Sequence, residues 1–470
     1  MIRTLVENCH IATCDGVGSE YEDGHLVVED GRIAAVGAGP PPELPPAAAS
    51  GGDRPSQAAG TAGGQTIHVD GRGCLLTPGL VNTHHHLYQW VTRAVSQDQT
   101  LFGWLTTLYP IWAGIDAEIV EAAAGANLGW LALTGCTTSS DHHYVFPKRG
   151  GDLMEAEITA ARRIGLRFHP ARGSMDLGQS NGGLPPDSVV EDRDEILRAT
   201  AAAIDTYNDP SEESLLRIVV APCSPFSVSE GLMCEAADLA RQKGVRLHTH
   251  LAETTDEDDY CTEHYGCTPT QYAERLGWLG DDVWMAHCVH LDDEAIDRFA
   301  ATGTGVAHCP TSNGRLGAGL APVQRLLRRQ VTVGLGVDGA ASNESGRMVD
   351  ELHQALLVAR LRDGPLALSA REALTMATVG GARCLGRERE LGSLEVGKLA
   401  DLALWRVDGI SGDGITDPVA ALVFGAPTLE RLWVSGRPIV EQQELLTADA
   451  RTLGAGAKRA AWELATRAGR

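Results

Sequence analysis

The sequence predicts an α/β fold: a (β/α)8 TIM-like barrel with a small β-sandwich domain formed from both ends of the chain. Two observations predict this architecture. Eight short apolar runs follow one another between residues 79 and 339, and stretches with helical periodicity separate them. Such alternation is typical of a closed parallel barrel. The residues before and after it show short strand patterns, so we expect the two ends to meet in one small domain.

The first strands of the chain precede a segment of very different composition. Residues 4–13 and 25–36 alternate or carry β-branched side chains, with a Glu-Asp-Gly turn in the second stretch. Residues 37–64 are rich in Pro, Gly and Ala and cannot bury enough apolar surface, which predicts a flexible surface insert. The predicted boundaries are 1–76 for the N-terminal part of the small domain, 77–386 for the barrel, and 387–470 for the C-terminal part and a tail.

Each predicted barrel strand is an apolar run that ends in polar residues. Helical patterns at 194–207, 229–244 and 292–303 open with Asp or Ser, and two of them end in Gly, as capped helices do. After the barrel, residues 371–386 are expected to be helical, and strands resume at 392–407 and 429–440. The eight strand runs are 79–86, 136–143, 165–173, 216–224, 244–253, 283–290, 304–313 and 331–339.

Charge and cysteine content exclude several classes of protein. With 39 basic and 62 acidic residues, the net charge of −23 disfavours nucleic acids and anionic membrane surfaces as partners. The 11 cysteines are odd in number and form no C-x-x-C pair, which indicates reduced thiols rather than a disulfide framework. No stretch is apolar enough for a signal peptide or a transmembrane helix, so we expect a cytoplasmic protein.

Residues that bind metals lie at the ends of the predicted strands, where barrel active sites form. His84 and His86 share one face of the first strand, because side chains alternate along a strand. His250 ends the fifth strand and Asp338 the eighth. Each motif alone has a simpler explanation, such as a core pair or a turn. Together they predict one Zn²⁺ per subunit, with Fe²⁺ or another first-row divalent metal as the alternative.

Five stretches resemble the amidohydrolase superfamily, and they cover almost the whole chain. The barrel motifs are PGLVNTHHH, LHTHLAET, AHCVHL and GVDGAASN, and GSLEVGKLADLALW resembles the return to the small domain. None of the chain's four lysines lies on the fourth strand, where binuclear members carry a bridging lysine, so the resemblance implies a mononuclear site. The H-x-E…P-C-x-x-C signature of cytidine-deaminase-type enzymes is also absent.

Within the superfamily, LHTHLAET and AHC resemble the aminohydrolase branch, which acts on purines, pterins and triazines. NTHHHLYQWVTRA, TTSSDHHYVFP, GGLPPDSVVEDRDEI and further stretches are similar to the 8-oxoguanine deaminases. Guanine deaminases carry an Arg where this chain reads Pro222-Cys223-Ser224-Pro225-Phe226. The resemblance implies hydrolysis of 8-oxoguanine to urate and ammonia. Asp338 would take a proton from water, Glu253 would protonate the ring nitrogen, and His287 would position the water.

The expected contacts to the substrate come from loops after the strands. Gln89 offers both a donor and an acceptor to a purine edge. Trp104 and Trp112 either cover the ring or pack in the core, and Arg172 either meets the 8-oxo group or forms an ion pair. Cys223 and Ser224 end the fourth strand and are expected to face the site, and Gly314 is expected to border it.

Two other functions stay open as alternatives. A related enzyme could act on isoxanthopterin, guanine or an s-triazine such as hydroxyatrazine, because only the pocket residues would differ. A non-enzymatic binding protein on a degenerate barrel would usually have lost metal ligands, whereas all four are present here. The acidic charge makes a free base a better substrate than a base in a nucleic-acid strand. The expected partner is a small molecule, and the resemblance implies a homo-oligomer.

Overall fold

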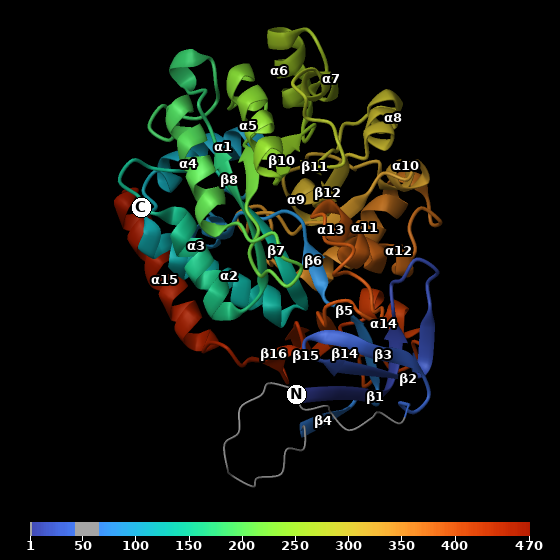
Figure 1. Ribbon diagram of the computed structural model, residues 1–470. Helices are drawn as coiled ribbons and strands as arrows, with labels where there is room; N and C mark the ends of the chain where they lie inside the picture. Colours follow the sequence, from blue (N-terminus) through green and yellow to red (C-terminus); the bar gives the residue numbers. More distant parts are fainter. Residues whose placement is uncertain (1, 43–64) are drawn as a thin grey trace.

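The computed structural model describes residues 2–42 and 65–470 and contains a closed eight-stranded parallel barrel (Figure 1). Each of the eight predicted runs overlaps one barrel strand, so the predicted barrel is confirmed. The strands close in the order β10-β11-β12-β13-β6-β7-β8-β9. They span β6 (Leu80–Asn82), β7 (Cys136–His143), β8 (Arg167–Ser174), β9 (Val219–Pro222), β10 (Arg246–Leu251), β11 (Val283–His287), β12 (Gly305–His308) and β13 (Val333–Leu335).

Helices cover the outside of the barrel, and their caps explain where they begin. Asp192 caps the helix that the sequence analysis opened at residue 194, and Ser229 and Asp292 cap the next two predicted helices. The helices are α1 (Leu101–Trp112), α2 (Ala117–Leu133), α3 (Leu153–Ile164), α4 (Arg193–Tyr207), α5 (Glu230–Lys243), α6 (Thr255–Tyr265), α7 (Pro269–Arg275), α8 (Asp293–Thr302), α9 (Pro310–Arg315), α10 (Val323–Arg328), α11 (Met348–Asp363), α12 (Ala370–Thr375), α13 (Gly381–Cys384), α14 (Pro418–Phe424) and α15 (Ala450–Arg467).

Three short helical segments complete the chain. The 3₁₀ turns η1 (Leu87–Thr92) and η2 (Gln179–Asn181) follow β6 and β8, and the π-helical segment η3 (Met376–Gly380) joins α12 to α13. The sequence predicts a helix over 371–386, and α12, η3 and α13 form it. Among the described residues, no helix has both the length and the apolar character needed to cross a membrane.

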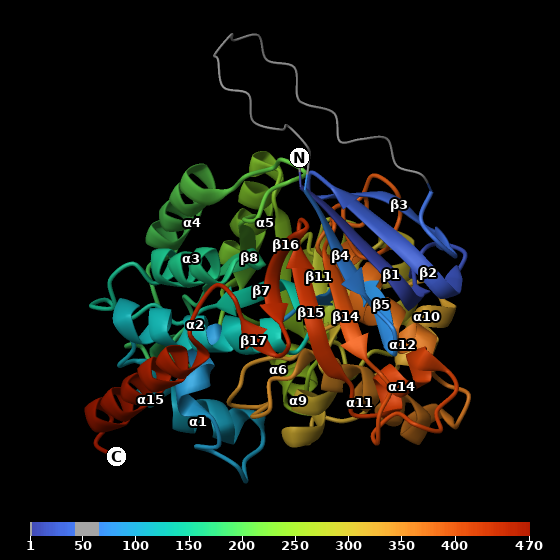
Figure 2. The ribbon, with the colours of Figure 1, turned by 90° about the horizontal axis from the view of Figure 1, so that it is seen from below.

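The small domain is one nine-stranded sheet to which both ends of the chain contribute (Figure 2). Its core contains Leu26, Leu76, Leu402 and Trp433, and the buried Arg167–Asp401 ion pair connects it to the barrel strand β8. Residues 43–64 of the predicted insert lie outside the described residues. The strands are β1 (Ile2–Ala12), β2 (Glu20–Glu29), β3 (Arg32–Ala38), β4 (Gln65–Asp70), β5 (Cys74–Pro78), β14 (Leu402–Arg406), β15 (Thr428–Val434), β16 (Arg437–Glu441) and β17 (Glu444–Leu445).

The last helix of the chain belongs with the barrel rather than with the sheet. The sequence predicts only a tail in this region, but α15 lies along α2 in both views (Figures 1 and 2). Its buried residues Ala457, Ala460 and Leu464 lie three to four positions apart and form the face that it packs inward. The small side chains of α2 leave room for this close contact.

Candidate active site

Four predicted ligands meet at the carboxyl end of the barrel strands. His84 and His86 follow β6, His250 lies near the end of β10, and Asp338 follows β13. Asp338 Oδ1 lies 3.3 Å from Nε2 of His84 and 3.3 Å from Nε2 of His86. His86 Nε2 lies 3.2 Å from His250 Nε2. All four side chains are buried.

The hydrogen bonds on the far side of each imidazole fix which nitrogen carries the proton. His86 Nδ1 donates to the carbonyl oxygen of His142 and His250 Nδ1 to that of Cys223, both at 2.6 Å. Their Nε2 atoms therefore present lone pairs to each other at 3.2 Å. This contact is repulsive unless a cation lies between the two nitrogens.

A longer chain of hydrogen bonds fixes His84 in the same way. His248 Nδ1 donates to the carbonyl oxygen of Trp284, so its Nε2 accepts from His84 Nδ1 at 2.8 Å. His84 Nε2 then also presents a lone pair, and it is buried with no hydrogen-bond partner among the described residues. Burial lowers the pKa of His86 to about 4, so the imidazole is neutral, as a metal ligand must be. Three histidine lone pairs and one carboxylate fit a zinc site. The other ring nitrogen of each histidine, Nδ1, is held in place by a hydrogen bond.

Glu253 and His287 lie beside these four residues. His287 Nε2 is 3.6 Å from Glu253 Oε2 and 3.9 Å from Asp338 Oδ2, so it stands between the two carboxyl groups. Burial raises the pKa of Glu253 to about 7, and His287 opposes that rise. The carboxyl group can therefore hold a proton near neutral pH and release it, which is what a general acid needs.

The site is held by strained backbone and by a short helix. His287 has a φ of 70° and Asp338 a φ of 64°, the left-handed region that non-glycine residues rarely adopt and that clusters at functional sites. Ser312 Oγ donates to Asp338 Oδ2 at 2.5 Å, and His287 Nδ1 donates to Asn313 Oδ1 at 2.9 Å. Both supporting residues lie on α9. Neither residue was predicted as part of the site, although Cys-Pro-Thr-Ser-Asn directly follows the seventh strand.

A pocket opens over the cluster and has mostly aromatic and apolar walls. Trp104 lines it, as do Cys223 and Ser224, which the sequence analysis placed at the end of the fourth strand. Gln89 is fully buried, with its amide against the backbone of Gly339, and both its amide atoms lack a hydrogen-bond partner among the described residues. Wall residues that the sequence analysis missed are Leu101, Leu105, Tyr109, Tyr144, Phe226 and Leu316.

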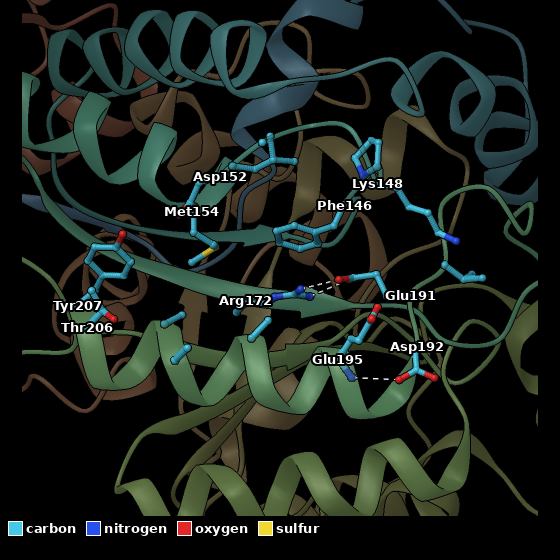
Figure 3. Close-up of a pocket in the computed structure, with 17 residues that line it drawn as sticks. Phe146, Lys148, Asp152, Met154, Arg172, Glu191, Asp192, Glu195, Thr206 and Tyr207 are labelled. Atoms are coloured by element: carbon cyan, nitrogen blue, oxygen red, sulfur yellow. Dashed lines mark hydrogen bonds and ion pairs between the residues drawn. The ribbon is translucent and has the colours of Figure 1, made fainter.

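Arg172 forms an ion pair, which is one of the two alternatives that the sequence left open for it. Its guanidinium group forms two hydrogen bonds with Glu191, at 2.9 and 2.7 Å, and stacks 3.8 Å from the centre of the Phe146 ring. These residues line a separate cavity of about 820 Å³ between α3 and α4 (Figure 3). Arg172 is therefore an ion-pair residue, because the carboxylate of Glu191, in the loop before α4, already accepts the hydrogen bonds that its guanidinium group would give to a ligand.

Trp112 takes the core position that the sequence left open for it, and Gly314 lies elsewhere than expected. Trp112 is fully buried, packs edge-on against Trp104, and donates from Nε1 to Thr92 Oγ1, so it belongs to the core behind the pocket wall. Gly314 is exposed and has open space where a side chain would stand, so it does not border the pocket.

Comparison with known proteins gives the family. The model of the amidohydrolase family matches residues 75–439. The chain is 42% identical to the 8-oxoguanine deaminase of Pseudomonas aeruginosa over 93% of either chain. It is 38% identical to an isoxanthopterin deaminase from an unknown prokaryotic organism, over 85% of this chain and 88% of that one. The structure of atrazine chlorohydrolase from Arthrobacter aurescens, complexed with zinc, superposes with a TM-score of 0.89 at 34% identity, covering 98% of this chain and all of that one. The chain therefore belongs to the amidohydrolase family and is an enzyme.

Proposed function

We propose that this enzyme hydrolyses 8-oxoguanine to urate and ammonia, with a zinc ion held by His84, His86, His250 and Asp338. The observation that carries the proposal is the placement of Glu253. This carboxyl can hold a proton near neutral pH, and it lies beside four converging ligand atoms at the base of an aromatic pocket. The 8-oxoguanine deaminase at 42% identity supports this choice of substrate.

The residues of the site can carry every proton that the reaction moves. A zinc ion at this site would supply Lewis acidity and lower the pKa of a water molecule. Asp338 accepts a proton from the attacking water, and Glu253 donates a proton to the ring nitrogen next to the amino-bearing carbon. His287 holds the water between the two carboxyl groups. The amino group then takes the proton held by Asp338 and leaves as ammonia, and the added hydroxyl group gives its proton to Glu253 as the C=O bond of urate forms.

The pocket wall supports a flat, uncharged heterocycle as the substrate. Trp104, Tyr109 and Phe226 offer ring faces and edges, and no Lys or Arg lies among the wall residues. The buried amide of Gln89 has no hydrogen-bond partner within residues 2–42 and 65–470, which is costly unless a ligand supplies one. We propose that it hydrogen bonds to one edge of the base, with Cys223 and Ser224 at another edge. Because the net charge of −23 repels a phosphate backbone, a free base in the cytoplasm is a better substrate than a base in a nucleic-acid strand.

A pterin or a triazine is the second candidate. The isoxanthopterin deaminase noted above and a hydroxydechloroatrazine ethylaminohydrolase from Pseudomonas sp. strain ADP, 34% identical over 95% of this chain, share the scaffold. The same metal and the same acid would serve these substrates. Only the contacts of Gln89, Cys223 and Ser224 would differ.

The test is a parallel assay of four substrates. The zinc-loaded protein is incubated with 8-oxoguanine, guanine, isoxanthopterin and hydroxyatrazine, and ammonia release is followed together with urate formation. We expect rapid turnover of 8-oxoguanine alone, with one urate per ammonia. Turnover of the pterin or the triazine without 8-oxoguanine turnover would retain the proposed acid and ligands and overturn the proposed substrate.

A further inference from the structure

A second cluster of ionisable side chains lies behind the metal ligands, and the proposed reaction does not use it. Asp141 and His143 come from β7 and Glu157 from α3. None of the three side chains has any exposed surface. One nitrogen or oxygen from each lies within 4.8 Å of the other two. Because water cannot reach these three side chains, the protons that they need must be shared within the cluster.

The hydrogen bonds around the cluster show where protons must lie. His143 Nε2 donates to the carbonyl oxygen of Val145, and Asp141 Oδ1 accepts from the backbone N–H of Leu87 at 2.6 Å. His143 Nδ1 lies 2.7 Å from Glu157 Oε1, a distance that requires one proton between them. The two carboxyl groups also lie close enough to hydrogen bond with each other.

The remaining oxygens locate a second proton. Asp141 Oδ2 and Glu157 Oε2 are fully buried, and neither has a donor among the described residues. A proton between the two carboxyl groups would satisfy both groups. Two protons on the three side chains make the cluster electrically neutral, which burial strongly favours. Burial raises the pKa of Glu157 to about 8 and lowers that of His143 to about 4, in agreement with neutral side chains.

The charged residues nearest to the cluster do not change the number of protons that it holds. Arg172 on β8 and Glu191 before α4 both face His143, but they are paired with each other. Tyr88, from η1, packs its ring 4.9 Å from that of His143 and adds no charge. No lysine or unpaired arginine faces the cluster among the residues that the structure describes.

The cluster is connected to the metal ligands at two points. Leu87, whose N–H it binds, directly follows His86 and begins η1, which also carries Gln89. His142 lies between Asp141 and His143, and its carbonyl oxygen accepts the proton of His86 Nδ1. The orientation of His86 therefore depends on the end of β7 and the start of η1, and the cluster joins these two segments.

We propose that Asp141, His143 and Glu157 form a neutral network that shares two protons and positions the ligand His86. The proposal rests on the proposed function only in taking His86 as a metal ligand. The three residues touch neither substrate nor metal, so they are positioning residues. Their effect reaches the site through the Leu87 N–H and the His142 carbonyl.

The test compares amides with apolar side chains of similar size. In the double variant Asp141→Asn/Glu157→Gln, each amide carries a hydrogen where the neutral network has one. The asparagine oxygen accepts from Leu87, its nitrogen donates to the glutamine oxygen, and the glutamine nitrogen donates to His143 Nδ1. The matched variant Asp141→Leu/Glu157→Met removes these bonds, and Glu155→Gln, on the same helix but partly exposed, is the control.

Zinc affinity is the main readout, and kcat and KM for the accepted substrate are measured alongside. We expect the double amide to bind zinc with about wild-type affinity and the apolar pair to bind it about 10- to 100-fold more weakly. If the apolar double variant does not fold, the zinc affinity of the double amide variant still tests the proposal. Loss of zinc from the amide pair would overturn the proposal. So would a second metal equivalent that the wild type binds and the amide pair does not. Zinc affinity needs no substrate, so failure of the four-substrate assay would leave this test intact.

Discussion

At the residue scale, the two carboxyl groups of the site differ because their neighbours differ. Asp338 faces His84, His86 and His287, and these imidazoles hold its pKa well below the usual range despite its burial. Burial raises the pKa of Glu253 to about 7, and His287 opposes that rise while the neighbouring Asp338 adds to it. Two carboxyl groups whose environments separate their pKa values in this way take the roles of base and acid.

This difference predicts the behaviour of the Glu253→Gln variant. Glutamine keeps the size of the side chain but cannot release a proton to the ring nitrogen. We expect zinc content to stay at the wild-type level while kcat falls by about 10²- to 10⁴-fold, the usual contribution of a positioned acid. Steady-state kinetics and metal analysis of the same preparation measure both quantities.

The control for this variant is Glu263→Gln, which changes an exposed glutamate on α6. It should leave kcat and zinc content unchanged. A near-normal kcat in Glu253→Gln would show that another group protonates the ring. Zinc loss in the same variant would instead place Glu253 among the ligands.

The sequence could predict the strand-end residues, because side-chain alternation and strand order decide where they lie. His84, His86, His250 and Asp338 were placed in this way. Arg172 shows the limit of that reasoning. Alternation puts it at a strand end, but its partner Glu191 comes from a loop whose path no local pattern reveals. The sequence could not decide between the two alternatives for Trp112 for a related reason, since its position depends on how α1 is rotated.

At the element scale, the short helix α9 aims two reactive side chains. Ser312 holds Asp338, and the next residue, Asn313, fixes the proton of His287 on Nδ1. His287 Nε2 is therefore the atom that faces Glu253 and Asp338. The sequence analysis expected a strand to continue through this segment to residue 313. The helix begins at Pro310 instead, because proline suits the first turn of a helix.

Asn313→Ala tests this role of α9. The change leaves the buried Nδ1–H of His287 without an acceptor, which costs about 1–3 kcal/mol. If this cost raises the activation free energy of the reaction, kcat should drop by roughly 5- to 150-fold while the zinc content is unchanged. Gly314→Ala, one residue on, is the control, because a methyl group there meets open space. Equal kcat values in the two variants would contradict the assignment.

At the scale of the whole molecule, the barrel buries many ionisable groups, and this shapes its stability. Burial raises the pKa of Glu157, Glu257 and Glu351 to about 8. It lowers the pKa of His85 and His248 from 6.5 to about 3. Relative to the unfolded chain, the folded protein therefore keeps extra protons on these carboxyl groups up to about pH 8. The unfolded histidines are mostly neutral above about pH 7. The slope there is therefore set by the carboxyl groups together with buried cysteines such as Cys136 and Cys223, whose pKa burial raises to about 12.

The free energy of unfolding of the metal-free protein should therefore fall as the pH rises from about 7 to about 8.5, since the folded state binds more protons than the unfolded state over this range. Chemical denaturation of chelator-treated protein at several pH values and constant ionic strength measures the slope. The Asp141→Asn/Glu157→Gln variant should show a shallower fall, because it removes two of the groups responsible. A free energy of unfolding that stays constant or rises over this range would mean that the buried carboxyl groups are ionised in the folded protein, which would contradict the neutral network behind His86.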